Sequence, residues 1–279
     1  MIEIRPMTID DLQLGLRLTR QAGWNQTESD WLRFMNLEPE GCFVAELDGY
    51  SVGTTTTCIF SQVAWIAMVL VDVNARGKGI GTTLLKHAVE FLQRPEVVKT
   101  IRLDATPAGR HIYEKLGFVP EYGLSRYAGI ARWLGAGRPV SNVTAECLLS
   151  IIEFDKQITG TDRGKMLTKL FTEYPENFRV HSTGGKIEGF ITMRPGANAV
   201  QIGPCIATTN AGTILLYDAL NRAAQKPVFI DIPTDNIEAV KIAESSGLKI
   251  QRHFTRMYFG DPIKEHINGI WASSGPEKG

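Results

Sequence analysis

The chain has 279 residues, 43% of them hydrophobic and 22% charged, and its 30 basic side chains balance 30 acidic ones. This length suits two domains with a sizeable core, and the zero net charge argues against partners such as nucleic acid or an anionic membrane. The longest apolar run, 63–71, is too short to span a bilayer, and no export signal opens the chain, so we expect a globular cytoplasmic protein.

The first elements of the chain carry clear local signals. Thr8 followed by Asp11 has the capping-box spacing and predicts a helix to about residue 20. The strands expected at 43–47 and 50–53 flank Asp48-Gly49, which supplies the positive φ angles of a tight hairpin. The run 64–73 is apolar and β-rich without alternation, which predicts a strand covered on both faces.

A glycine-rich turn at 76–81 follows that strand. Apolar residues recur at helical spacing over 81–92, so the turn leads into a helix. A short strand at 100–103 and a helix at 107–116, ended by Gly117, complete the first half. The segment 135–139 has the composition of a linker, and we place a domain boundary there, giving domains 1–134 and 135–279.

The second half repeats the first at low identity. The hairpin 43–53 has a counterpart at 179–189 with an offset of about 136 residues, Gly81 corresponds to Gly212, and Gly117 corresponds to Gly247. Nearly constant offsets over matching elements predict that the same α/β fold occurs twice, although two unrelated α/β halves could show such similarity by chance.

The turn at 76–82 is predicted to bind an anion. A helix N-terminus offers unpaired N–H groups and the positive end of the helix dipole, and glycines let the backbone approach an oxygen-rich ligand. Thr82 stands where a dinucleotide-binding loop would have its third glycine, and no Gly-Lys-Ser/Thr sequence follows. A phosphate-bearing ligand other than ATP or NAD is therefore indicated.

Arg76, Gly79 and Gly81 fit the R/Q-x-x-G-x-G/A motif, and this segment resembles the GNAT family of N-acetyltransferases over about residues 2–126. The hairpin, strand, turn, helix and the segment 113–118 come in the family's order. The resemblance implies two tandem GNAT-like domains, each a mixed, mostly antiparallel twisted sheet flanked by helices. It also implies acetyl-CoA as co-substrate, with no metal. The pantetheine arm of the cofactor would contact Val71 and Val73. Its pyrophosphate would contact the loop residues Arg76, Gly77, Lys78, Gly79, Ile80, Gly81 and Thr82.

The same resemblance places Tyr113 near the thioester sulfur, where a phenol can protonate the departing thiolate; the alternative is a packing role. A backbone N–H at the end of strand 69–71 is the expected oxyanion donor. The general base stays open among four carboxylates. Two aromatic residues either shape the acceptor pocket or belong to the core. The carboxylates are Asp72, Asp104, Glu28 and Asp30, and the aromatic residues are Trp24 and Trp31.

The second half has lost the site. Ala207 replaces Arg76, Asn210 replaces Gly79 and Ala243 replaces Tyr113 at the repeat offsets, which predicts a degenerate copy. Five short segments resemble the C-terminal domain of bacterial tandem acetyltransferases of the YitH type: 154–155, 161–163, 194–196, 202–204 and 255–257. Of these residues Asp155, Asp162 and Arg163 either bind substrate or, as we favour, form a buried ion pair that joins the halves.

The sequence thus indicates an enzyme that acetylates a primary amine of a small metabolite, as a monomer or homodimer. The alternatives are acetylation of a protein lysine or N-terminus, and a sensor that binds acyl-CoA without turnover. Retention of both the loop and Tyr113 argues against the sensor. The four cysteines and five histidines of the chain show no metal-ligand spacing, so no metal site is predicted.

Overall fold

The computed structural model describes residues 1–94, 96–137 and 139–277, so Arg138 of the expected linker lies outside the described residues. The helices and strands of the first half are β1 (Ile2–Pro6), α1 (Leu12–Gln21), α2 (Glu28–Leu37), β2 (Cys42–Leu47), β3 (Tyr50–Phe60), β4 (Val63–Val71), α3 (Ile80–Gln93), β5 (Thr100–Ala105), α4 (Pro107–Lys115) and β6 (Val119–Ile130). Those of the second half are β7 (Ser141–Asn142), α5 (Ala145–Thr159), α6 (Gly164–Glu173), β8 (Arg179–Thr183), β9 (Lys186–Arg194), β10 (Val200–Ala207), α7 (Thr209–Arg222), β11 (Pro227–Pro233), α8 (Ile237–Ser245), β12 (Lys249–Gly260) and β13 (Ile270–Ala272).

Most predicted elements of the first half are confirmed. Asp48 and Gly49 have φ angles of 52° and 83° and close the hairpin between β2 and β3. The capping box of Thr8 and Asp11 is present, but it caps a single 3-10 turn that leads into α1. Strand β4 ends at Val71, two residues earlier than expected, because the side chain of Asp72 accepts the N–H of Asn74 and starts a 3-10 turn.

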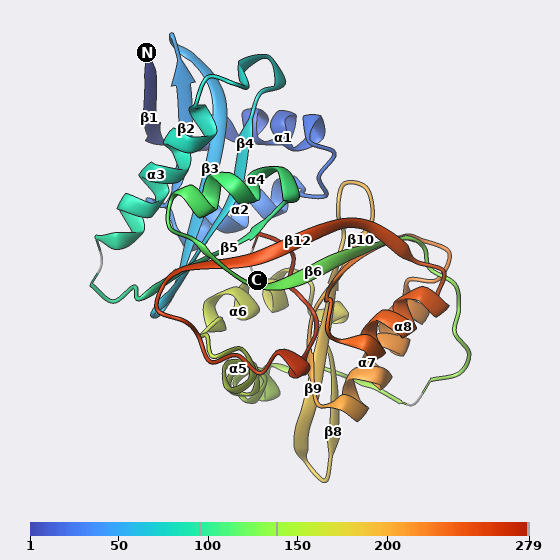
Figure 1. Ribbon diagram of the computed structural model, residues 1–279. Helices are drawn as coiled ribbons and strands as arrows, with labels where there is room; N and C mark the ends of the chain where they lie inside the picture. The colour runs from blue at the N-terminus through green and yellow to red at the C-terminus, as the bar shows by residue number, and fades with distance from the viewer. Residues whose placement is uncertain (95, 138, 278–279) are drawn as a thin grey trace.

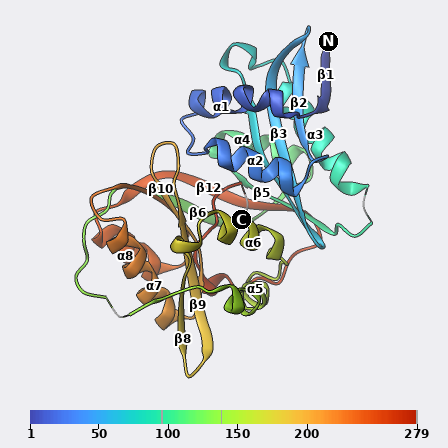
Figure 2. The same cartoon turned by 180° about the vertical axis from the view of Figure 1, so that it is seen from behind.

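The predicted repeat is confirmed by the element bounds. Helices α4 and α8 are related by a shift of 130 residues, as are the strands β6 and β12 that follow them. The tight turn between β8 and β9 has positive φ angles at Gly184 and Gly185, matching the turn between β2 and β3. Apart from β13, both halves therefore have the same order of elements, with helices on both faces of a mostly antiparallel sheet (Figures 1 and 2).

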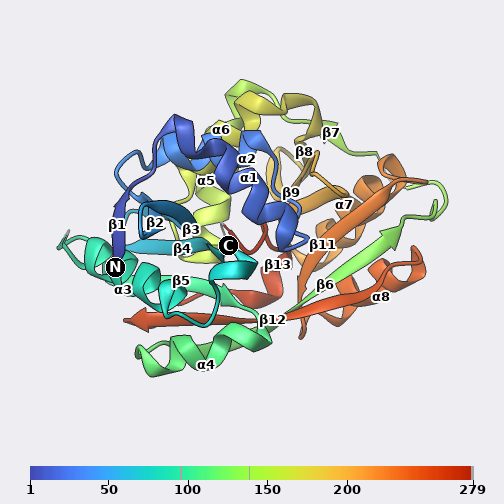
Figure 3. The same ribbon diagram turned by 90° about the horizontal axis from the view of Figure 1, so that it is seen from above.

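The two halves share one sheet and exchange β6 and β12, the strands that follow α4 and α8. The strand order is β1-β2-β3-β4-β5-β12-β6-β11-β10-β9-β8-β7, so β12 of the second half pairs with β5, and β6 of the first half pairs with β11. Figures 1 and 3 show β6 and β12 crossing the middle of the molecule side by side. The boundary at 134/135 remains a prediction, and the sheet pairs strands from the two sides of it.

One buried arginine–aspartate pair bridges each of the two exchanged junctions. Arg256 on β12 lies directly opposite Asp104 on β5 and donates two hydrogen bonds of 2.9 Å to its carboxylate. Arg126 on β6 lies opposite Asp231 on β11 and donates two bonds of 2.8 Å. Bidentate geometry satisfies both charges, and removing either partner would leave a buried charge unpaired.

Candidate active site

Strands β4 and β5 separate at the site. They pair in parallel only from Val63 opposite Thr100 to Trp65 opposite Arg102, and then diverge. Met68 has a φ of 50° at a bulge in β4, and the hydroxyl of Thr54 donates to the Met68 carbonyl at 3.1 Å. The bulge thereby leaves the β5-facing edge of β4 free to receive an extended ligand.

A groove follows this free edge to the N-terminus of α3. Val71, Arg76 and Gly81 line it, and the Nε of Arg76 donates to the Val71 carbonyl at 3.2 Å, which fastens the turn to the strand. Gly77 and Gly79 have φ angles of 78° and 80°, which only glycine adopts without strain. The N–H groups of the first helical turn are directed to this end of α3, so the turn offers an anion site.

The predicted cofactor residues are therefore brought together with one exception. Residues 77–82 form the turn and the first turn of α3 beside Val71. Val73 does not lie in the strand, contrary to expectation; it belongs to the 3-10 turn that Asp72 starts, and its exposed fraction is 45%. Ile80 is buried in the core, so only its backbone N–H is available at the turn.

An inner cavity of about 90 Å³ adjoins the groove. Trp24, Val69, Thr106 and Tyr113 line both spaces and mark where they meet. The remaining wall of the cavity comes from both halves, including polar and charged side chains. Those of the first half are Gln26, Asp104 and Arg126, and the second half contributes Arg252, Phe254, Pro276 and Glu277.

Tyr113 lies on α4 at this meeting point. Burial raises the pKa of its phenol to about 12, so the hydroxyl stays protonated at neutral pH. Its position depends on Gly109, where an added Cβ would lie 3.1 Å from the tyrosine ring. Thr106 caps α4 by accepting the N–H of Gly109, which fixes the helix start beside the groove. A neutral proton donor thus stands between groove and cavity.

Of the four carboxylates weighed as general base, only Asp104 lines the cavity, and its oxygens bind Arg256. Asp72 binds Arg17, and the Asn74 N–H together with this guanidinium holds its pKa below the usual range. Glu28 is exposed at the start of α2. The fourth carboxylate, Asp30, caps α2 through the N–H of Thr27 and is buried among arginines.

The two tryptophans have different positions. Trp24 lines both groove and cavity, as expected of a residue that shapes the site. Trp31 is fully buried in the core, where its indole N–H donates to the Thr19 hydroxyl at 3.2 Å and its ring packs against Gly15.

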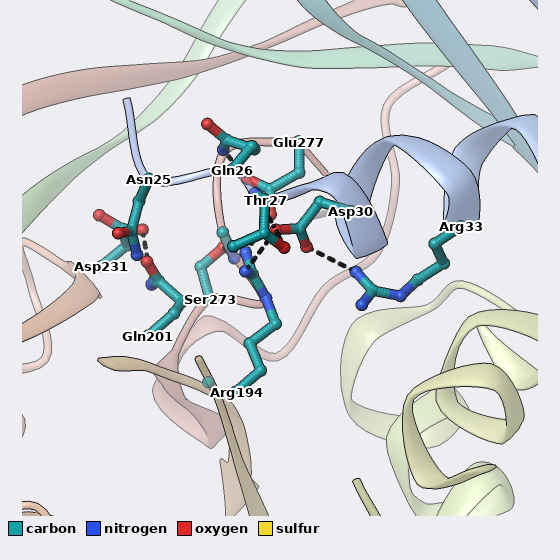
Figure 4. Close-up of polar contacts among 12 residues, drawn as sticks. Asn25, Gln26, Thr27, Asp30, Arg33, Arg194, Gln201, Asp231, Ser273 and Glu277 are labelled. Atoms are coloured by element: carbon teal, nitrogen blue, oxygen red, sulfur yellow. Dashed lines mark hydrogen bonds and ion pairs between the residues drawn. The ribbon is translucent and has the colours of Figure 1, made fainter. Parts of the chain in front are cut away.

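Sequence reasoning missed the C-terminal segment, which carries Glu277 into the cavity wall (Figure 4). Glu277 accepts a hydrogen bond of 3.0 Å from Gln26 and pairs with Arg194 at 2.5 Å. Arg194 also forms an ion pair with Asp30 at 3.0 Å, and Asp30 pairs with Arg33 at 2.7 Å. This buried chain of alternating charges joins the halves; its partners lie up to 251 residues apart, and no local pattern announces it.

The segment 24–26 is held against the second half. Asn25 accepts the N–H groups of Asn198 and Ala199 at 2.9 and 3.0 Å, and its own carbonyl accepts the N–H of Ala197 at 2.9 Å. The second half therefore positions a wall of the cavity in the first half.

In the second half, the region that corresponds to the groove is filled by the chain itself. Strand β13 lies where β10 and β11 diverge, pairing with β10 at Cys205 and Ile206 and bonding β11 through Ser273. Trp271 on β13 covers the first turn of α7 so closely that a Cβ on Gly212 would lie 2.0 Å from its ring. Degeneration of this copy thus includes occupation of its groove.

The expected ion pair in the second half exists but does not join the halves. Arg163 donates to the buried Asp155 at 3.0 Å, and the two connect the start of α6 to α5. Asp162 is more exposed and lies 3.5 Å from Lys156. Other buried pairs join the halves, among them Arg194 with Asp30 and Arg256 with Asp104.

Family models match both halves: the acetyltransferase (GNAT) family over residues 9–118 and the acetyltransferase (GNAT) domain over residues 151–272. The chain belongs to the GNAT acetyltransferases. It is a tandem N-acetyltransferase, as the loop at 76–82 suggested. In the residues that the structure describes, no helix is long and apolar enough to cross a membrane, and no group of metal-ligating side chains is present.

Similar proteins span most or all of this tandem GNAT protein. Holothin acyltransferase from Pseudoalteromonas sp. is 26% identical over 99% of this chain and 94% of its own. The uncharacterized N-acetyltransferase YitH from Bacillus subtilis is 23% identical over 79% of this chain and 78% of its own. A crystal structure from Pyrococcus horikoshii, of a protein proposed to be an acetyltransferase, has a TM-score of 0.83 at 25% identity, covering 100% of this chain and 96% of that one.

Proposed function

We propose that this protein transfers an acetyl group from acetyl-CoA to a primary amine of a small molecule, by direct attack of the amine on the thioester. The observation that carries the proposal is the meeting of two spaces at Tyr113: an open groove that ends at the N-terminus of α3, and a small cavity. A donor that enters by the groove and an acceptor in the cavity would place the thioester beside the phenol.

The groove fits the donor in two respects. The β4 edge beyond Trp65 is not paired with β5, so the backbone up to Val71 can bind the pantetheine arm as an added strand would. The N–H groups of residues 77–82, with Arg76 nearby, would bind the pyrophosphate. One acyl-CoA is expected per chain, because Trp271 covers the corresponding helix start in the second half.

The chemistry required of the protein is modest. Attack by a neutral amine on the thioester carbonyl forms a tetrahedral intermediate, whose oxyanion a backbone N–H at the β4 bulge would stabilise. Collapse of the intermediate breaks the C–S bond, and Tyr113 would donate a proton to the departing thiolate. The attacking nitrogen loses a proton to solvent water to complete the amide, and the Tyr113 phenolate takes up a proton from solvent. Because the phenol stays protonated below about pH 12, it can serve as donor throughout the neutral range.

A small acceptor is favoured by the size of the cavity and by its walls. A protein lysine needs an open surface groove, whereas this cavity of about 90 Å³ is bounded by the second half and by the C-terminal segment. The relative from Pseudoalteromonas, similar along nearly the full chain, is named for acyl transfer to holothin.

The test is release of free thiol from acetyl-CoA in the presence of a panel of small amines, lysine-containing peptides and a buffer blank. Amine-dependent release with small amines, reduced in Tyr113→Phe, supports the proposal. Release with peptides alone would favour the protein acetyltransferase. Binding of acetyl-CoA without amine-dependent release of thiol would favour the sensor that binds acyl-CoA without turnover. Absence of acetyl-CoA binding would refute the assignment of the groove.

A further inference from the structure

Among the described residues, an arginine of the cavity wall has no carboxylate partner. Arg252 on β12 is half-buried and lines the cavity, and within residues 1–94, 96–137 and 139–277 no hydrogen bond or ion pair of its guanidinium is found. The other buried guanidiniums around this space are paired. Arg256 binds Asp104, and Arg194 binds both Asp30 and Glu277.

The position of Arg252 is electrostatically unfavourable. It lies directly opposite Arg126 in the pairing of β12 with β6, and like charges at opposed positions repel. Arg126 already occupies both oxygens of Asp231, one of which also accepts a hydrogen bond from Gln201. Burial and the neighbouring guanidinium of Arg126 accordingly lower the pKa of Arg252, with Asp231 opposing them.

A bulge in β12 produces this arrangement. The register shifts between Ile250 and Arg252, so that Gln251 falls outside the regular pairing with β6. Bulges of this kind redirect side chains and occur beside active sites. Here the side chain that follows the bulge lines the cavity, on the β12 segment that the second half contributes to the first.

A second polar atom of the cavity wall is also unsatisfied. The side chain of Gln26 is 4% exposed, and its Nε2 donates to Glu277. Its Oε1 is buried and has no hydrogen-bond partner among the described residues. A buried acceptor without a partner is costly, and an N–H of a bound ligand would satisfy it. The cavity thus presents one unused cationic donor group and one unused acceptor.

We propose that Arg252 binds a carboxylate of the acceptor, so that the substrate is a small amine bearing a carboxylate, such as an amino acid. This rests on the proposed function and names its substrate class. A guanidinium matches a carboxylate with two parallel N–H···O bonds, and the ligand supplies the negative charge that Arg252 lacks. The amine of the same molecule then donates to Gln26 while its lone pair stays available for attack.

The experiment compares matched substrates, alanine with ethylamine and phenylalanine with phenylethylamine, in the full-length protein. The variants are Arg252→Gln, Arg252→Lys and, as control, Lys249→Gln, which removes an exposed positive charge from the same strand. Arg252→Gln should raise KM for the amino acids about 10- to 100-fold and leave the decarboxylated amines unchanged. Arg252→Lys should recover part of the loss, and Lys249→Gln should behave as wild type.

Two further measurements separate this role from a structural one. The free Arg252→Gln variant should melt at the wild-type temperature or above it, because a repulsion is removed, and its affinity for acetyl-CoA should not change. Equal effects on both members of each pair, or a clear fall in Tm, would overturn the proposal. If no amine is acylated, the proposed function fails. The role of Arg252 is then tested by calorimetry with alanine and phenylalanine. Equal binding by Arg252→Gln and wild type refutes this role, and loss of binding in Arg252→Gln supports it.

Discussion

Replacing Arg194 by Met should destabilise the protein by about 3 kcal/mol. The side chain is 2% exposed and makes charged hydrogen bonds to Asp30 at 3.0 Å and to Glu277 at 2.5 Å. Two such bonds contribute about 1.5–3 kcal/mol each. Asp30 retains Arg33 after the substitution and Glu277 retains Gln26, so the loss should lie at the low end.

Urea unfolding of the free protein measures this loss. Arg20→Met is the control, because that side chain is exposed and, within the described part of the chain, bonds only the Leu16 carbonyl of its own helix. The control should change the free energy of unfolding by less than about 0.5 kcal/mol. Combining Arg194→Met with Asp30→Asn should recover part of the loss, since one buried charge is removed with its partner. A loss below about 1 kcal/mol for Arg194→Met would show that the chain of charges does not stabilise the contact between the halves.

Three further predictions concern the site and its degenerate copy. Tyr113→Phe should lower kcat about 100-fold with little change in acetyl-CoA affinity. Because the phenol titrates only near pH 12, the variant should lower the pH–rate profile without moving its limbs between pH 6 and 9. An unchanged kcat would return Tyr113 to a packing role. Gly212→Ala should destabilise the protein by about 1–3 kcal/mol, seen as a lower Tm, because its Cβ would overlap Trp271. Gly81→Ala should not lower Tm, because its Cβ would contact Val71 only at 3.6 Å. Equal melting temperatures of the two variants would contradict this. Titration calorimetry with acetyl-CoA should give one site per chain, and a stoichiometry of two would refute the occupation of the second groove by β13.

Local sequence signals predicted the local structure well. Asp48-Gly49 specified a hairpin, and the glycines at 77 and 79 adopt the positive φ angles that the turn requires. Thr27 and Asp30 also have capping-box spacing and begin α2, which explains why Asp30 is a structural carboxylate. Val73 was misplaced because Asp72, a residue that favours turns, ends the strand before it.

Long-range features could not be predicted in this way. The edge of β5 can pair with either β6 or β12, which share length and position in the repeat, and sequence patterning does not distinguish the two partners. Glu277 reaches Gln26 from the other end of the chain. Among the described residues Arg252 has no counter-ion, and this is likewise a property of the assembled cavity, since it depends on which side chains Asp231 has already bound.

The exchange of β6 and β12 bears on why a copy whose groove is filled is kept. After an ordinary duplication, a second domain that has lost its catalytic residues can be deleted by truncation of the gene without harm to the first. Here the same truncation removes the strand beside β5, leaves Asp104 buried without Arg256, and opens the cavity at Arg252. The two copies can therefore be inherited only together. The site of one half can degenerate freely, but its strands cannot be lost.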